Sequence, residues 1–272
     1  MQYWFMMKTL FALQFVLFLL FCSESPATSG SPDLEEEILP DSIWQRRVEN
    51  NAFDVQEELT FLVRFGPVKA GTAVMSIPEI KELRSRKCYR AVTTIKSNSF
   101  MSGFFHVDDH IESLIDVRGI YSWYFDKKIR EGKFVADRTA IFDHARGLVF
   151  EEQDTTKVPP FTQDVLSVFY YIRTQPLVVG QSFYVDNYAD KKFYPLEVKV
   201  HKKEKVKVPA GRFNCIKIEP VMRGSGLFSQ KGRLWVWLSD DTRRLIVKIK
   251  SKISVGYLTL ELQRAKGVKD LP

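Results

Sequence analysis

Histidine and cysteine are scarce in this sequence, and so are the motifs in which they usually act. The 272 residues include four histidines and three cysteines. There is no Gly-x-Ser-x-Gly nucleophile motif, no Cys-x-x-Cys or His-Glu-x-x-His motif and no glycine-rich phosphate-binding loop. These absences argue against the common hydrolases, zinc enzymes and nucleotide-binding proteins. We therefore expect no enzymatic activity, no catalytic residue and no cofactor.

Two polar patterns in the sequence are candidates for a metal site or a catalytic site. In His106-x-Asp108-x-His110 alternate side chains of a strand would point to one face, about 6.6 Å apart, as two metal ligands could. A polar outward face beside a turn explains the same pattern, so no metal is expected. The pairs Glu151-Glu152 and Asp240-Asp241 cannot each form a glycosidase dyad, because adjacent strand residues point to opposite faces. A glycan-acting enzyme is therefore the weakest hypothesis.

Long hydrophobic runs are lacking, except at the N-terminus. Leu10 to Phe21 is apolar apart from Gln14, follows Lys8, and precedes the small residues of Ser25 to Gly30. This order is typical of a secretory signal peptide. A run of about 12 residues is too short for a bilayer, which needs about 20. We predict a signal peptide over residues 1–29 and export to the periplasm.

Two alternatives to cleavage stay open. Counting Tyr3 to Met7 lengthens the apolar run, so the N-terminus could remain as a membrane anchor. Cys22 could carry a lipid instead, although Phe21 is bulky where a lipoprotein signal normally has a small residue. Cleavage after Ala27-x-Ser29 fits the sequence better, and we expect no lipid on Cys22.

No linker rich in proline, glycine or serine divides the remaining chain. Residues 30–54 contain Pro32, Pro40 and the acidic run Glu35 to Glu37, which predicts a flexible lead-in. Residues 55–265 then form a single β-rich domain, followed by a C-terminal tail over residues 266–272. This length is compatible with one β domain.

Cys88 and Cys215 are the cysteines that remain after the expected cleavage. Two cysteines are too few to staple a small fold, so a hydrophobic core must hold the domain together. Export permits a disulfide between them, and two buried free thiols are the alternative. A bridge needs Cα atoms within about 7 Å, a distance that the sequence does not provide.

Apolar residues alternate with a period of two through most of the domain. Leu59, Phe61, Val63 and Phe65 share one strand face, and the pattern recurs several times. One segment over residues 162–174 instead repeats at helical spacing and ends before Pro176, with Thr162 as the expected N-cap. The prediction is a mainly β fold, with a strongly curved antiparallel sheet or incomplete β-barrel and one covering helix.

Positive charge is in excess, with a formal net charge of +7. Leu196 to Val208 is predicted to be a hairpin that turns at Lys202-Lys203-Glu204 and has a cationic outer face. Solvated lysines on an antiparallel pair are the simpler interpretation. A contact with an anionic membrane surface is the alternative, through Lys199, Lys203, Lys205 and Lys207. Nucleic acid is not expected as a partner of an exported protein.

Aromatic residues gather at two places in the predicted strands. Tyr121, Trp123 and Phe125 share one face, and so do Trp235 and Trp237. Core packing is the default interpretation. The alternative is that these five side chains line an apolar cavity for a lipid.

Several phrases in order resemble a known family. They are residues 65–73, 109–116, 164–173, 208–215 and 237–241. Together they are similar to a family of exported bacterial proteins catalogued only as a domain of unknown function, commonest in Bacteroidetes and proteobacteria. The resemblance covers residues 57–263 and implies no catalytic residue. More loosely, the plan is similar to the half-barrel of periplasmic lipoprotein carriers, a likeness of fold that does not fix function.

The first functional hypothesis is therefore a periplasmic or envelope binding module that carries a lipid, lipoprotein or other amphiphile. The alternative is a structural or interaction protein of the envelope whose core is filled by its own side chains. The sequence carries no signal for the ligand, the pathway or the oligomeric state.

Overall fold

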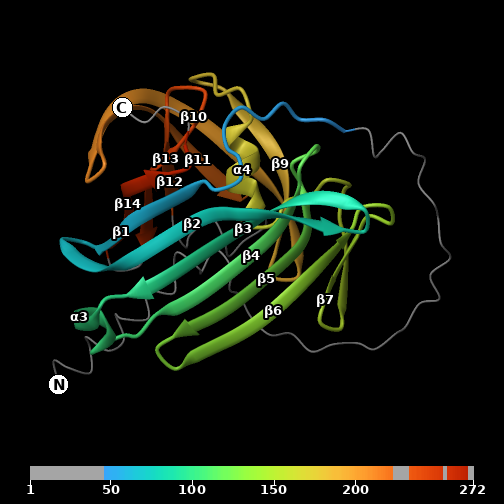
Figure 1. Cartoon of the computed structure of the whole chain (residues 1–272), viewed down its shortest axis with the longest axis horizontal. Helices are drawn as coiled ribbons and strands as arrows, with labels where there is room; N and C mark the ends of the chain where they lie inside the picture. The colour runs from blue at the N-terminus through green and yellow to red at the C-terminus, as the bar shows by residue number, and fades with distance from the viewer. Residues whose placement is uncertain (1–45, 223–232, 254–255, 269–272) are drawn as a thin grey trace.

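Figure 1 shows the protein as a computed structural model, which describes residues 46–222, 233–253 and 256–268. Over these ranges the chain forms fourteen strands and two short helices. The first eight strands are β1 (Glu58–Phe65), β2 (Val68–Leu83), β3 (Arg86–Ser97), β4 (Asp108–Asp116), β5 (Ser122–Glu131), β6 (Phe134–Asp143), β7 (Leu148–Glu151) and β8 (Asp154–Lys157). The others are β9 (Ser182–Ala189), β10 (Lys192–Val208), β11 (Gly211–Met222), β12 (Arg233–Ser239), β13 (Ile246–Ile253) and β14 (Gly256–Lys266). The helices are α3 (Ser99–Ser102) and α4 (Ser167–Arg173).

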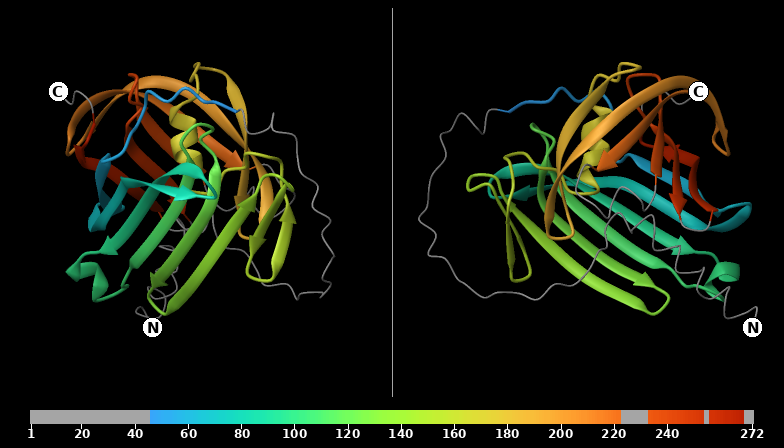
Figure 2. Two further views of the ribbon diagram at one scale, coloured as in Figure 1. Left: turned by 45° about the vertical axis from the view of Figure 1, so that its right-hand side comes forward. Right: turned by 180° about the vertical axis from the view of Figure 1, so that it is seen from behind.

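All fourteen strands belong to one antiparallel sheet. Its order is β8-β7-β6-β5-β4-β3-β2-β1-β14-β13-β12-β11-β10-β9, so the pairing of β1 with β14 joins the two halves of the chain. The sheet bends into two arms that face each other, with α4 between them (Figures 1 and 2). The terminal strands β8 and β9 do not pair, and the barrel stays incomplete. The predicted fold class is confirmed.

Irregular pairing accompanies the curvature. The register shifts between Ser76 and Glu79 where β2 pairs with β3, at the position of Pro78, which has no N–H for a ladder. It shifts again between Val63 and Arg64 and between Val200 and Lys202. Such bulges bend a strand and increase its twist, which a sheet needs in order to curl around a core.

The predicted helix is present but shorter than expected. It begins at Ser167, because the Asp164 carboxylate accepts hydrogen bonds from the backbone N–H groups of Leu166 (2.6 Å) and Ser167 (2.8 Å). The hydroxyl of Thr162 instead donates to the carbonyl of Pro159 at 2.7 Å. The acidic residue therefore starts the helix, and the expected threonine cap was wrong. Neither helix in the described ranges has the length and apolarity needed to cross a bilayer.

The predicted hairpin within Leu196 to Val208 was also wrong. These residues belong to one continuous strand, β10, and the chain turns afterwards, between Val208 and Gly211. A bulge near His201 lets the strand continue through the lysines that resembled a turn. Alternation along a bulged strand changes phase, which the sequence pattern alone mistook for a reversal.

The structure also describes the end of the expected lead-in and the two cysteines of the domain. Ala52 and Phe53 are buried, so the described end of the lead-in packs on the domain instead of being flexible. Cys88 and Cys215 are both buried and both free, on β3 and β11. The disulfide is absent, and each thiol behaves as a small core residue.

Candidate ligand cavity

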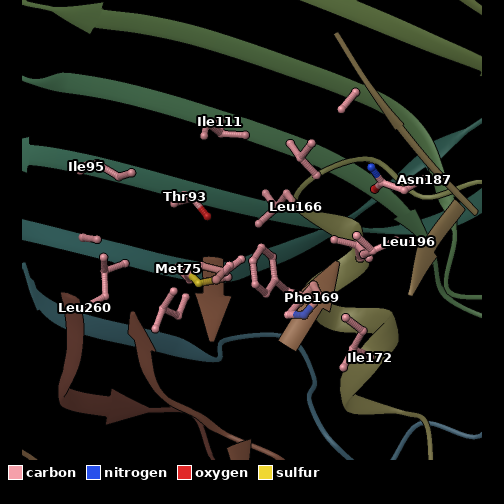
Figure 3. A pocket seen from close by; sticks show the side chains of 17 residues that line it. Met75, Thr93, Ile95, Ile111, Leu166, Phe169, Ile172, Asn187, Leu196 and Leu260 are labelled. Atoms are coloured by element: carbon pink, nitrogen blue, oxygen red, sulfur yellow. The ribbon is translucent and has the colours of Figure 1, made fainter. Parts of the chain in front are cut away.

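A cavity of about 150 Å³ lies between α4 and the concave face of the sheet (Figure 3). Its walls come from both arms of the sheet and from the helix, and all of the lining residues except two are apolar. They are Ala73, Met75, Thr93, Ile95, Ile111, Val165, Leu166, Val168, Phe169, Ile172, Asn187, Ala189, Leu196, Pro220, Leu234, Ile249 and Leu260. A space of this volume and character resembles engineered apolar cavities that bind small hydrophobic molecules.

The helix that roofs this cavity is fixed at both ends by buried charges. At its start, Asp164 also accepts a hydrogen bond from the hydroxyl of Ser113 on β4 at 2.5 Å. At its end, Arg173 forms a bidentate ion pair with Glu57 at 2.6 and 2.7 Å. The Arg173 guanidinium also donates to the carbonyl oxygen of Ala52 at 2.8 Å. These contacts place Phe169 and Ile172 over the sheet.

The two polar residues of the cavity have unpartnered atoms. Thr93 on β3 and Asn187 on β9 are buried, and the Thr93 hydroxyl oxygen and the Asn187 side-chain carbonyl oxygen have no hydrogen-bond partner. Figure 3 shows both side chains among the apolar lining. A buried polar atom without a partner costs about 1–3 kcal/mol. A bound molecule with a polar group could remove that cost.

A second, smaller cavity of about 30 Å³ adjoins the first and shares Ile95 and Leu260 with it. Two acids line it, Asp109 on β4 and Glu131 at the end of β5, with 1% and 3% of their surfaces exposed. Burial is the main cause that raises the pKa of Asp109 to about 6 and that of Glu131 to about 8. The concave face thus ends in a pair of carboxyl groups that retains a proton near neutral pH.

The five aromatic residues predicted to line a cavity do not line either of these two. Tyr121 and Trp123 pack with Cys88 and Leu114 in a separate cluster, around the buried ring of His144. Phe125 belongs to the main core, but it does not line the cavity. These three aromatic residues are buried and packed against other side chains, and a part in ligand binding stays a prediction.

Trp235 and Trp237 lie on the face of β12 opposite the cavity. Their rings contact the Lys217 ammonium group at 5.1 Å, and the Trp237 indole N–H donates to Glu204 at 2.8 Å. Leu234, on the other face of the same strand, lines the cavity. The strand is apolar on both faces because lysine side chains cover the tryptophans on one side.

The lysines predicted to meet an anionic surface are all on β10, but the bulge after Val200 places Lys199 on one face of the strand and Lys203, Lys205 and Lys207 on the other. Lys199 lies 3.9 Å from Glu197, and Lys203 forms an ion pair with Asp240 at 2.8 Å. Lys205 and Lys207 are exposed. Lys203 is exposed as well and Lys199 is half-buried, and the membrane contact stays a prediction.

The third pattern is the spacing His106-x-Asp108-x-His110, which the sequence analysis considered for a metal site. Asp108 is exposed and lies 3.2 Å from Lys96, and no group of three or more ligating side chains occurs among the described residues. Sequence reasoning missed Asp109, one residue further on. Asp109 is in phase with Ile111, Ser113 and Ile115, so a charged residue at a core position of β4 was the available signal.

Comparison with solved structures finds a β-barrel-like protein of the domain of unknown function DUF1849 from Brucella abortus. The TM-score is 0.57 at 12% identity, and the match covers 82% of this chain and 100% of that chain. At this identity the likeness concerns the fold alone. The barrel-like neighbour agrees with the incomplete barrel described above.

Two bacterial structures match with lower scores. One comes from Bacteroides fragilis and is described as a protein inferred to be exported, with a YmcC-like fold. Its TM-score is 0.39 at 14% identity, and the match covers 81% of this chain and 99% of that chain. The other comes from Parabacteroides distasonis and is described as inferred to be a lipoprotein. Its TM-score is 0.37 at 11% identity, and the match covers 82% of this chain and 100% of that chain.

A search of curated proteins finds no match. The family model described as "Protein of unknown function (DUF3108)" matches residues 60–263, which is most of the domain and nearly the span of the predicted resemblance. The chain belongs to the DUF3108 family, a family of unknown function.

Proposed function

We propose that this protein is a non-enzymatic binding module of the bacterial envelope that holds the apolar part of a lipid or another amphiphile between α4 and the sheet. The observation that carries the proposal is the cavity of about 150 Å³, whose lining is apolar except for Thr93 and Asn187. Ligand sites are typically concave, mostly apolar and equipped with a few polar groups.

The two adjoining cavities suit a chain-like ligand. An apolar chain beneath Phe169 could continue past Ile95 and Leu260, which line both spaces. Each methylene removed from water contributes about 0.8 kcal/mol, so even a short buried stretch of chain gives measurable affinity. Binding of a longer chain would require the helix to move away from the sheet.

Binding is tested with a neutral fluorescent acyl probe and a variant that fills the cavity. Ala73→Leu adds a side chain inside the first cavity, and Ala136→Leu makes the same change on β6, away from it. We expect saturable binding to the native protein, at least a tenfold loss in Ala73→Leu, and native affinity in Ala136→Leu. No binding to the native protein, or equal binding to both variants, would refute the proposal.

The alternative function is an envelope structural or interaction protein with a filled core. The small volume of the cavity favours it, because most buried side chains belong to one continuous hydrophobic cluster. Absence of probe binding, together with no lipid in mass spectra of the purified native protein, would support this alternative.

The envelope location is part of the proposal and rests on the signal-like N-terminus. The intact mass of the protein from an envelope fraction should correspond to a chain that begins near Gly30 and has no lipid on Cys22. A diacylated Cys22 terminus would instead make the protein a lipoprotein, and a full-length mass would indicate an uncleaved anchor.

A further inference from the structure

The acid pair at the end of the concave face has no counter-ion in the described part of the chain. Asp109 Oδ1 accepts a hydrogen bond from the backbone N–H of Arg130 at 2.8 Å. The outer oxygens, Asp109 Oδ2 and Glu131 Oε2, are buried and receive no donor from the chain. They can bond to each other only when one carboxyl carries a proton.

The cations nearest to this pair have other partners. Lys96 lines the second cavity, but its ammonium group lies 3.2 Å from Asp108 on the outer face. The Arg130 guanidinium forms an exposed pair with Asp137 at 2.6 Å. Burial still raises the pKa of Asp109, and the Arg130 guanidinium lowers that pKa only as the smallest of several causes. In the part of the chain that the structure describes, no cation forms an ion pair with either acid.

The geometry identifies what would compensate the negative charge of the pair. Asp109 Oδ2 and Glu131 Oε2 are two acceptors beside a small space, and an ammonium group has several hydrogens to donate to them. A divalent metal ion suits the site less well, because hard cations prefer six or more oxygen ligands. An anionic head group would be repelled by the pair.

We propose that Asp109 and Glu131 form the recognition site for a cationic amine head group, so that the ligand of this protein is an amine-bearing amphiphile. This inference rests on the proposed function, because its apolar part must occupy the first cavity. Ile95 and Leu260 border both spaces and connect the alkyl chain with its head group. When the ammonium group binds, it replaces the proton shared by the carboxyls, and that proton leaves to solvent.

The experiment compares dodecylamine, dodecanol and dodecanoate, which share one chain length and differ in charge. Each competes with the neutral acyl probe below its micelle concentration. We expect the amine to bind the native protein at least tenfold more tightly than the alcohol, and the carboxylate to bind most weakly. Titration calorimetry at pH 7 in buffers of different ionisation enthalpy should detect proton release with the amine only.

Variants assign the preference to the acid pair. Asp109→Asn with Glu131→Gln should lower the amine affinity to that of the alcohol, abolish proton release and leave the alcohol affinity unchanged. Glu131→Gln alone replaces the double variant if the latter does not fold. The control is Asp108→Asn, which removes an exposed carboxylate from the same strand and should keep the preference.

The outcomes separate this inference from the proposed function. Equal affinities for amine and alcohol, or an amine preference that survives in the Asn/Gln variant, would overturn the amine site while the carrier function stands. Failure of every amphiphile and of the probe to bind the native protein would overturn both. A preference lost equally in Asp108→Asn would assign the effect to surface charge and also overturn the site.

Discussion

Two buried pairs lie at opposite ends of β1 and differ in how their charges are satisfied. Glu57, the residue before β1, forms an ion pair with Arg173, and both of its carboxylate oxygens accept hydrogen bonds from the guanidinium. Near its other end, Val63 borders the cavity that contains Asp109 and Glu131. The first pair joins opposite charges, whereas the second places two like charges together.

The difference distinguishes the structural role of the first pair from the binding role that we propose for the second. A buried charge is tolerated in a fold when the chain supplies its partner, as Arg173 does for Glu57 and for the end of α4. A pair of like charges adds nothing to folding when it is ionised. The cationic amine that we propose as its partner would supply the positive charge that the chain does not place beside it.

The largest effect is expected when the structural pair is broken. Arg173→Met leaves the Glu57 carboxylate buried without a partner and should lower the free energy of unfolding by about 3–5 kcal/mol. Urea denaturation measures this change. The double variant Arg173→Met with Glu57→Gln should recover part of it, because the orphan charge is gone. Arg130→Met, which breaks an exposed pair, should have a far smaller effect, because solvent screens that pair.

A loss of under about 1 kcal/mol in Arg173→Met would contradict the structural role of the Glu57 pair. It would indicate that water reaches the end of α4 and solvates Glu57 once the arginine is removed. The comparison between the two pairs would then lose its basis.

The second prediction concerns the two faces of β12. Trp237→Ala should cost about 3 kcal/mol, near the lower end for a buried tryptophan, because the covering lysine side chains can close over the gap. Probe affinity should not change, since Trp237 lies away from the cavity. Ile249→Ala, which enlarges the cavity from β13, should alter probe affinity. An equal effect of both variants on the probe would show that the cavity extends to the outer face.

The third prediction is a pH dependence that belongs to the acid pair. Both folded-state pKa values are raised, Asp109 from 3.8 to about 6 and Glu131 from 4.5 to about 8. Between pH about 4 and pH about 8, the folded protein therefore binds more protons than the unfolded chain. Stability from this pair is complete below pH about 4 and is lost as the pH rises through about 8.

Glu131→Gln should remove most of this slope. Compared with the native protein, the variant should gain roughly 1–2 kcal/mol of stability between pH 6 and pH 8. Thermal unfolding at three pH values measures it, with Asp108→Asn as the control that keeps the native slope. An unchanged slope in Glu131→Gln would mean that the pair is solvated and carries no shared proton.

Much of the fold could be predicted from the sequence, because alternation reports which residues share a face. The strand phase of Leu59, Phe61 and Val63 and the helical spacing before Pro176 were both confirmed. The cavity could not be predicted, because alternation does not tell the concave face of a strand from the convex one. Leu234 and Trp235 are both apolar, and only the curvature of the sheet decides that Leu234 faces the cavity.

Pairs of residues distant in the chain were also beyond prediction. Glu57 and Arg173 meet across 116 positions, and nothing near either residue signals the other. Asp109 and Glu131 did leave a signal, since each is a charged residue in phase with buried apolar neighbours of its strand. A charge at a core position marks a site, but sequence alone does not say whether its partner lies within the chain.

The smallest effect is expected for four lysines of β10, because their charges are exposed and their partners are surface groups. Replacing Lys199, Lys203, Lys205 and Lys207 with Gln should shift the free energy of unfolding by less than about 0.5 kcal/mol, because exposed pairs such as Lys203 with Asp240 contribute little. Sedimentation with anionic vesicles tests the second interpretation of these lysines. If they contact a membrane, the variant should lose about 1 kcal/mol of vesicle binding per lysine. Vesicle binding that is unchanged in the variant, or absent from the native protein, would leave these lysines solvated, with no part in binding.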